Sequence, residues 1–340
     1  MVKLGDVINV HYGKALKADQ RVSNGSVHVF GSSGIVGNHD KTLCSYPTII
    51  IGRKGSVGAI TWAPDGGWII DTAYYVEIKD NNKLDLRYLF YILSGIDLTK
   101  KTITTSIPGL NRDDLYDTFI KLPPFEEQKR IVDLLDKAEG IRQKREQAIK
   151  LADDFLRAKF LEMFGTPANN IHRFPKGTIR DLVDSVNYGT SAKASIDSGE
   201  YPILRMGNIT YQGRWDFTDL KYLDLSVKEK DKYLVKEGDL LFNRTNSKEL
   251  VGKTAVYEED RPMAFAGYLI RVRPNSIGNN YYISGYLNSI HGKITLMNMC
   301  KSIVGMANIN AQELQNIEIL IPPKHLQDEY EIIYKKIKKD

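Results

Sequence analysis

The chain has 340 residues, a mass of 38.5 kDa and a formal net charge of +5 at pH 7. Hydrophobic residues at 42% and charged residues at 26% exclude a disordered or fibrous protein, and the length is sufficient for two globular domains. No apolar run of about 18 residues is present, and two cysteines are too few for a disulfide scaffold or a zinc cage. We therefore expect a cytoplasmic protein with no membrane-spanning helix and no signal peptide.

Residues 1–122 have the pattern of a mixed α+β domain. β-branched and aromatic residues gather at Thr48–Ile51 and at Tyr74–Ile78, which predicts short strands. A turn is predicted at Pro64-Asp65-Gly66-Gly67 and a short helix at Asp85–Leu93. We therefore predict a first globular domain over residues 1–122.

Residues 123–165 predict one long helix. Proline pre-sets the first helical turn, Glu126 and Glu127 favour the positive end of the helix dipole, and Gly165 ends the helix. Apolar residues recur in alternating steps of three and four, which is the spacing of a coiled-coil seam and requires a second helix in contact. The predicted seam consists of Ile131, Leu134, Ala138, Ile141, Ala148, Ala152 and Phe155.

The pattern of the first domain returns after this helix. Strands are predicted at Asp239–Phe242 and Ala255–Tyr257, and a helix at Asn280–Ile290, which together predict a second α+β domain over residues 166–321. Residues 322–340 begin a second helix. Its seam residues are Tyr330, Ile333 and Ile337.

An internal repeat organises the chain. Setting Pro123-Pro124 over Pro322-Pro323, a shift of 199 residues, brings Asn111 onto Asn310. Further matches follow in the same order: Asp6–Gly13 with Asp181–Gly189, Ile51–Arg53 with Phe242–Arg244, and Tyr88–Ile96 with Tyr282–Ile290. The predicted fold class is therefore α+β, with two repeated globules joined by a long coiled-coil helix and a shortened second helix at the C-terminus.

Three segments resemble conserved parts of the specificity subunit of type I restriction–modification systems. They are Leu122–Val132 (LPPFEEQKRIV), Leu4–Val7 (LGDV) and Ile179–Leu182 (IRDL). The resemblance extends over essentially the whole chain and departs from the family pattern where the second helix lacks its final turns. It implies a non-catalytic, cytoplasmic, prokaryotic subunit whose two target recognition domains, residues 1–122 and 166–321, read a bipartite double-stranded DNA sequence.

The resemblance also implies the partners. The helices at 123–165 and 322–340 would dock two methyltransferase subunits, and restriction subunits would join the complex indirectly. S-adenosylmethionine, ATP and Mg²⁺ would belong to these partners, so we expect no cofactor in this chain. Because the second helix is short, we also expect weak partner binding or self-association through the exposed seam.

Polar loops that follow predicted strands are the candidate DNA contacts. Lysine and hydroxyl groups suit phosphates, whereas arginine can bond guanine and asparagine can bond adenine in two places each. An ordinary surface loop or a structural ion pair is the alternative for each loop. The candidates are Tyr12, Lys14, Arg53, Lys54 and Ser56 in the first domain, and Tyr188, Thr190, Ser191, Lys193, Arg205, Asn208, Arg244, Asn246, Ser247 and Lys248 in the second.

Two other functions fit parts of the sequence. Pro64-Asp65 with Glu77-Ile78-Lys79 matches a bare PD…ExK metal-nuclease pattern, but the aligned stretch Ile270–Arg273 of the second copy has no carboxylate. A scaffold whose two globules bind protein instead of DNA is the other alternative. The histidines have no metal-ligand spacing, and Leu122 and Ile321 replace the polar residue that an amino-methyltransferase needs before its Pro-Pro pair. We therefore expect no catalytic and no metal site.

Overall fold

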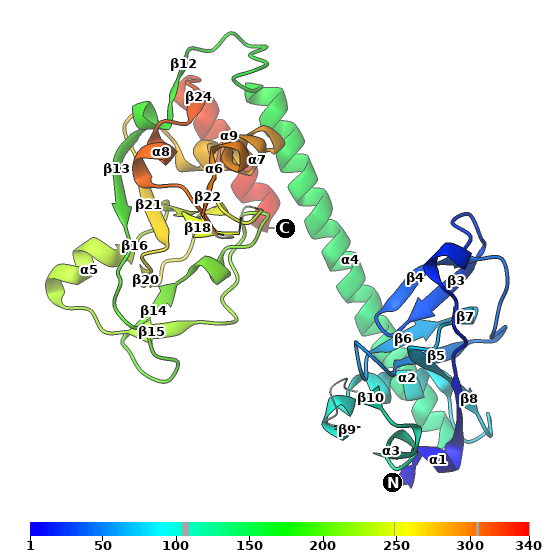
Figure 1. Ribbon diagram of the computed structural model, residues 1–340. Coiled ribbons are helices and arrows are strands. Elements are labelled where there is room, and N and C mark those ends of the chain that lie inside the picture. Colours follow the sequence, from blue (N-terminus) through cyan, green and yellow to red (C-terminus); the bar gives the residue numbers. More distant parts are fainter. Residues whose placement is uncertain (104–108, 248, 304–305, 340) are drawn as a thin grey trace. The chain divides into compact units, whose positions relative to one another are not determined.

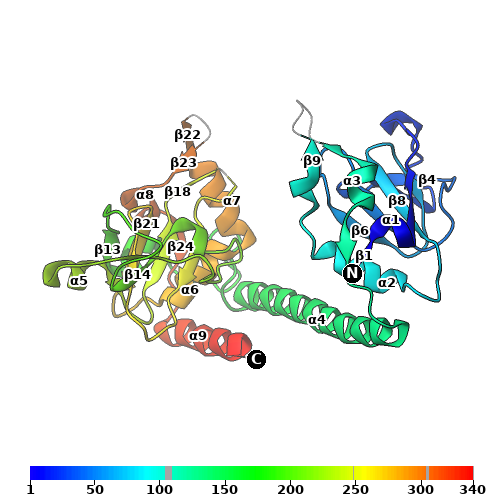
Figure 2. The ribbon, with the colours of Figure 1, turned by 90° about the horizontal axis from the view of Figure 1, so that it is seen from below.

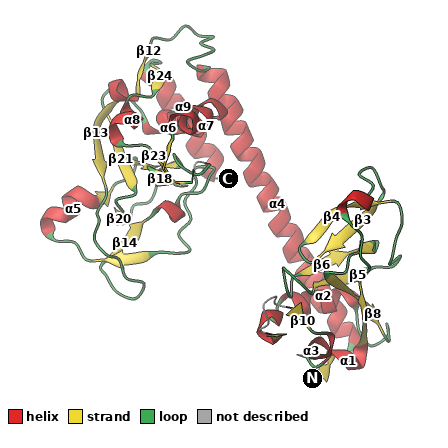
Figure 3. Cartoon of the chain, in the orientation of Figure 1, coloured by secondary structure: helices red, strands yellow, loops and turns green. Residues whose placement is uncertain are grey.

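The computed structural model describes residues 1–340 except 104–108, 248, 304–305 and 340 (Figure 1). The chain divides into two compact units, Met1–Lys144 and Arg145–Asp340, and the long helix α4 (Phe125–Phe164) contributes to both. Helices and strands are mixed in each unit, so the predicted α+β class with a long central helix is confirmed (Figure 3). The division into units lies within α4, and the domain limits at 122 and 165 stay a prediction. In the described part of the chain, no helix is both long and apolar enough to cross a membrane.

Unit 1 is built on an antiparallel sheet of four strands, in the order β2 (Ile8–Tyr12), β8 (Ala73–Ile78), β5 (Thr48–Gly52) and β6 (Ile60–Ala63). A second sheet has the order β4 (Gly34–His39), β3 (Val27–Gly31) and β7 (Trp68–Ile69), in which β3 and β7 are parallel. Strand β5 is buried on both faces: Ile49 and Ile51 pack into the larger core and Ile50 into a smaller one. The other elements are β1 (Val2–Lys3), α1 (Leu4–Val7), α2 (Leu86–Ser94), β9 (Thr102–Ile103), β10 (Gly109–Leu110), α3 (Arg112–Tyr116) and β11 (Phe119–Ile120).

Unit 2 repeats this plan with additions. Its main sheet has the order β13 (Val183–Tyr188), β21 (Leu269–Pro274), β17 (Leu240–Asn243) and β19 (Thr254–Val256). Its second sheet has the order β15 (Lys221–Leu223), β14 (Tyr201–Leu204), β20 (Met263–Phe265) and β16 (Leu234–Val235), in which β14 and β20 are parallel. The other elements are β12 (Lys176–Thr178), α5 (Val227–Tyr233), β18 (Thr245–Asn246), α6 (Asn280–Asn288), α7 (Ile290–Met299), β22 (Lys301–Ile303), β23 (Met306–Asn308), α8 (Ala311–Gln315), β24 (Glu318–Leu320) and α9 (Lys324–Lys339).

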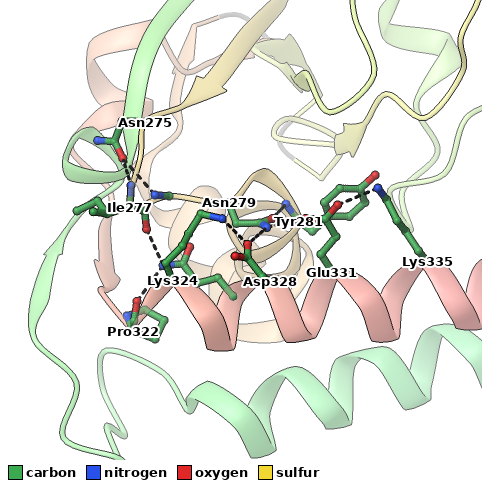
Figure 4. Close-up of polar contacts among 11 residues, drawn as sticks. Asn275, Ile277, Asn279, Tyr281, Pro322, Lys324, Asp328, Glu331 and Lys335 are labelled. Atoms are coloured by element: carbon green, nitrogen blue, oxygen red, sulfur yellow. Dashed lines mark hydrogen bonds and ion pairs between the residues drawn. The ribbon is translucent and has the colours of Figure 1, made fainter.

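Helix α9 is fixed to α6 by buried polar contacts (Figure 4). The Asn279 side chain, which caps α6 by accepting from the Tyr281 N–H, donates from Nδ2 to Asp328 Oδ1 at 2.8 Å and to Glu331 Oε2 at 2.7 Å. One amide therefore satisfies the first turn of α6 and two carboxylates of α9. The Lys335 ammonium pairs with Glu331 at 2.8 Å and continues this contact along α9.

The contact between α9 and α4 uses the predicted seam residue Tyr330 of α9, but on α4 it uses residues other than the predicted ones. In unit 2, α9 lies alongside the end of α4 (Figure 2), where the Tyr330 ring packs on Phe160 and Phe164 with centroid distances of 5.3 and 5.9 Å. Phe155, a predicted seam residue, remains 48% exposed. The prediction that the second helix covers Phe155 is wrong. Helix α9 buries the face of α4 that carries Phe160 and Phe164, because this face offers two aromatic rings to Tyr330.

Candidate nucleic-acid interface

Tyr12 and Arg53 come together where strands β2 and β5 of the main sheet of unit 1 both end. We call this end of the strands the sheet edge. Tyr12 is the last residue of β2, and Arg53 follows the last residue of β5. The Arg53 guanidinium carbon lies 5.0 Å from the centroid of the Tyr12 ring and 5.7 Å from that of Tyr74, which is within the range of a cation–π contact. Burial raises the pKa of the Tyr74 hydroxyl, which therefore stays protonated and donates to the Leu110 carbonyl at 2.9 Å.

Tyr188 and Arg244 form the same pair in unit 2. Tyr188 ends β13, Arg244 follows β17, and the guanidinium carbon lies 4.8 Å from the ring centroid. The Tyr188 hydroxyl accepts from the Ala311 N–H at 2.9 Å, and Arg244 donates to the Asn308 side chain at 3.4 Å. Both rings are partly exposed, by 47% for Tyr12 and 41% for Tyr188, so each pair lies at the protein surface.

The backbone around each arginine is held by equivalent hydrogen bonds. The Arg53 N–H donates to the Thr72 carbonyl at 2.9 Å, and the Arg53 carbonyl accepts from Leu110 at 2.9 Å. The Arg244 N–H donates to Tyr268 at 3.0 Å, and its carbonyl accepts from Ile309 at 2.9 Å. Each arginine is therefore held between the residue that precedes β8 or β21 and a residue at the end of the second hairpin strand, which is Leu110 in β10 or Ile309 directly after β23.

A glycine follows each tyrosine because the chain passes close to a carbonyl there. A Cβ atom on Gly13 would lie 2.1 Å from the carbonyl oxygen of Ile70, and one on Gly189 would lie 2.3 Å from that of Ala266. No side chain fits at these distances. The shared Tyr-Gly dipeptide is thus a requirement of the fold at the edge that carries the pair.

Neither guanidinium is neutralised by a carboxylate among the described residues. Arg53 donates to the Asp71 backbone carbonyl at 3.2 Å, and Arg244 donates to an amide oxygen. Elsewhere in unit 2 the arrangement differs, since Arg214 pairs with Asp153 at 2.7 Å and Arg273 with Asp239 at 2.8 Å. A fixed cation that lacks an internal counter-ion attracts an external anion.

Other predicted contacts lie close to the two pairs in sequence. Lys14, Lys54 and Ser56 are exposed in unit 1, as are Ser191 and Lys193 in unit 2, while Asn246 and Ser247 are half-buried. Asn246 lies in β18, the strand that begins directly after Arg244, and it pairs through its backbone with Ala307 of β23. Lys248 lies outside the described residues. A role for these side chains in DNA binding stays a prediction.

Three predicted contacts have structural roles instead. Asn208 is 2% exposed; its Oδ1 accepts from the Arg205 N–H at 2.8 Å and its Nδ2 donates to the carbonyls of Asp216 and Asp219 at 2.8 and 3.0 Å. Arg205 is paired with Asp219 at 2.8 Å. Thr190 is 5% exposed and its hydroxyl accepts from the Ala192 N–H. The prediction of DNA contacts is therefore wrong for Asn208 and Thr190, whose polar groups are bonded inside the fold, and for Arg205, whose charge is neutralised by Asp219.

Arg112 belongs to the site, although the sequence did not single it out. Its guanidinium carbon lies 5.2 Å from the centroid of the Tyr12 ring, so Arg53 and Arg112 both contact this ring. No carboxylate in the described part of the chain pairs with Arg112. The signal was its place directly after Asn111, whose match with Asn310 marks the repeat. It was missed because the second copy has Ala311 at the aligned position.

The nuclease alternative finds no support in the geometry. Glu77 accepts from His11 at 2.9 Å and from Asn9 at 3.4 Å, which lowers the pKa of its carboxyl. Over the described ranges, no group of three or more His, Cys, Asp or Glu side chains could hold a metal ion. Glu77 is therefore a hydrogen-bonded residue on the sheet surface, and Pro64-Asp65 lies at a turn.

Two units of one topology, each with an arginine clamped beside a tyrosine at the sheet edge, define a duplicated binding protein. The chain belongs to the family described as the type I restriction modification DNA specificity domain, whose model matches residues 1–151 and 174–339. The resemblance drawn from the sequence is thereby confirmed.

Two curated relatives are similar to parts of the chain. The protein named as the MjaX type I restriction enzyme specificity subunit of Methanocaldococcus jannaschii is 32% identical over 149 residues, which cover 43% of this chain and 35% of the relative. The EcoKI type I restriction enzyme specificity subunit of Escherichia coli is 26% identical over 225 residues, which cover 62% of this chain and 48% of the relative. The matches thus span about half or less of these relatives' length.

A solved structure has the same fold. The type I restriction–modification system S subunit from M. genitalium superimposes with a TM-score of 0.68 at 14% identity, covering 99% of this chain and 88% of that chain. At this identity the likeness establishes the arrangement of the backbone and nothing about individual residues.

Proposed function

We propose that this chain is the DNA-recognition subunit of a type I restriction–modification complex and reads a bipartite double-stranded DNA sequence, one half-site per unit. The observation that carries the proposal is the repeated pair, Tyr12 with Arg53 and Tyr188 with Arg244, each an unneutralised cation at the same sheet edge. A polyanion with two binding segments is a ligand that suits such a duplicated site. Membership of the specificity family supports the same conclusion.

The long helix is the proposed docking surface for two methyltransferase subunits. Leu134, Ile141 and Phe155 are 69%, 62% and 48% exposed and, with Ala148, follow one another in steps of seven residues. This spacing places them along one stripe of α4, and an apolar stripe in water is stabilised by a partner helix. A second copy of this chain is the alternative occupant, while restriction subunits would join through the methyltransferase.

In this proposal the chain performs no chemistry. S-adenosylmethionine, ATP and Mg²⁺ would be held by the partner subunits in the cytoplasm of a prokaryote. The contribution of this chain is the choice of sequence, which requires binding energy and rigid positioning.

Methylation of random-sequence duplexes by the methyltransferase subunit, with and without this chain, tests the proposal. We expect methylation only when the chain is present, at one split motif with a fixed gap. Methylation that ignores the chain, or metal-dependent cleavage by the purified chain alone, would contradict it. Assembly with the methyltransferase but no affinity for DNA would favour the protein scaffold.

A further inference from the structure

We infer that Arg53 and Arg244 each bind a phosphate of the DNA backbone, one in each half-site, and that neither arginine reads a base. This inference rests on the proposed function and assigns a role to its central residues. It replaces the expectation that these arginines bond guanine.

The arginine sites of the two units are equivalent. Arg53 and Arg244 each donate one backbone hydrogen bond and accept another. Each guanidinium carbon also lies beside a tyrosine ring, at 5.0 Å for Arg53 and 4.8 Å for Arg244. Two half-sites of a split sequence present different bases but the same sugar–phosphate backbone. A contact repeated with the same geometry therefore suits the constant part of the ligand, because phosphate contacts fix the register without carrying sequence information.

Each guanidinium is charged and held in place. Both lack a carboxylate partner in the described chain, and the tyrosine contact limits their side-chain freedom before any ligand arrives. A pre-organised cation loses little conformational entropy when it binds an anion. In unit 1, Arg112 adds a second cation beside Tyr12, which increases the attraction for a phosphate.

The two units differ in the strands that extend their parallel strand pair. In unit 1 the parallel pair β3–β7 is extended on one side only, by β4, whereas in unit 2 the parallel pair β14–β20 is extended by β15 on one side and β16 on the other. Helix α5 lies between β15 and β16 in sequence and has no counterpart in unit 1. Features that differ between the units are the ones able to encode different half-sites, so base reading is assigned to these additions and not to the arginines.

The experiment uses the full chain assembled with its methyltransferase subunits. Duplexes selected from a random-sequence library first give the preferred split sequence. Binding of this duplex and of its single-base-pair variants is then measured between 50 and 200 mM salt for wild type, Arg53→Gln, Arg53→Lys and Arg244→Gln. Glutamine removes the charge, whereas lysine keeps the point charge that serves a phosphate and removes only the planar fork of donors with which arginine matches guanine.

We expect each glutamine variant to weaken binding about tenfold, by the same factor for every duplex, and to reduce the slope of log K against log salt by about 0.9. Arg53→Lys should keep most of the affinity and all of the discrimination. The control is Lys3→Gln, which removes an exposed lysine of unit 1 that is already paired with Asp117 at 2.8 Å and should leave the slope unchanged.

Two results would overturn the inference: loss of discrimination at a single base pair in Arg53→Lys, or unchanged affinity in both glutamine variants. Failure of the selection to enrich any sequence would overturn the proposed function itself, so the two failures are distinguishable.

Discussion

Gln128 and Gln327 occupy the same position in the two units and donate the same two hydrogen bonds. Each amide donates from Nε2 to the first proline of the Pro-Pro pair, Pro123 at 2.9 Å and Pro322 at 2.9 Å. Each also donates to a carbonyl of the loop before the neighbouring helix, to Lys83 at 2.7 Å before α2 and to Ile277 at 2.9 Å before α6. Figure 4 shows Ile277 and Pro322 beside the beginning of α9. Both glutamine side chains are fully buried. The amides therefore connect the beginning of α4 to unit 1 and the beginning of α9 to unit 2.

Replacing Gln128 should destabilise unit 1 without affecting unit 2. In Gln128→Leu, the carbonyls of Lys83 and Pro123 and the Asp85 N–H lose their partner, and unpaired buried groups cost about 1–3 kcal/mol each. We expect a loss of about 3 kcal/mol in the stability of unit 1, measured by hydrogen exchange in α2. Gln327→Leu is the matched variant and should affect α6 instead. Equal effects of one variant on both units would show that the amides do not act locally.

Gly13→Ala should displace the chain at the Tyr12 site. The new methyl group would approach the Ile70 carbonyl to 2.1 Å, so the backbone must move, at a cost of about 1–3 kcal/mol. Gly140→Ala is the control, because nothing lies within 4 Å of that position in α4 and alanine favours a helix by about 1 kcal/mol. Thermal unfolding should show a lower midpoint for the first variant and an unchanged or higher one for the second. A stable Gly13→Ala protein with full DNA affinity would contradict the close approach.

The repeat in the sequence was enough to place Arg53 and Arg244 at equivalent strand ends, because the aligned segments carry the same buried strand before each arginine. The sequence could not reveal that Asn208 is occupied, since its partners are the carbonyls of Asp216 and Asp219, which a turn brings back to it. Nor could the heptad pattern decide which face of α4 is buried. The exposed stripe, which includes Phe155, and the buried face, which includes Phe160, alternate along the same part of α4. Only the contact with Tyr330 shows that the face of Phe160 is the buried one.

The exposed stripe of α4 gives a prediction for assembly. Ile141 is 62% exposed, so Ile141→Asp should leave both units folded and weaken binding of the methyltransferase by about tenfold or more. Ile131 packs at the edge of the core of unit 1, so Ile131→Asp should reduce stability as well as assembly. Sedimentation with and without the partner, together with circular dichroism, separates the two effects. If Ile141→Asp assembles as wild type does, the stripe is not the docking surface.

Lys293 gives a prediction for the pH dependence of stability. Its ammonium is buried without a hydrogen-bond partner in the described part of the chain, 4.7 Å from the Tyr211 ring centroid. Burial, reinforced by the charges of Arg157 and Lys253, lowers the pKa of Lys293 to about 8. Between this value and the ordinary 10.5, the unfolded chain holds a proton that the folded chain does not, so the stability of unit 2 rises with pH.

Lys293→Met should therefore stabilise unit 2 at pH 7, by about 3 kcal/mol at most, and reduce the gain in stability between pH 7 and 9.5. Urea unfolding is followed by the fluorescence of Trp215, with Trp62 and Trp68 replaced by phenylalanine. The signal then reports on unit 2, because Trp215 is the single tryptophan left in the chain. Lys228→Met removes an exposed lysine of α5 and serves as the control for loss of a charge. The pH range stops below 10 because buried tyrosines such as Tyr257, with a pKa raised to about 12, lower stability once the unfolded chain ionises. A Lys293→Met protein that is less stable than wild type at pH 7 would mean that the ammonium is satisfied by contacts other than the ring of Tyr211.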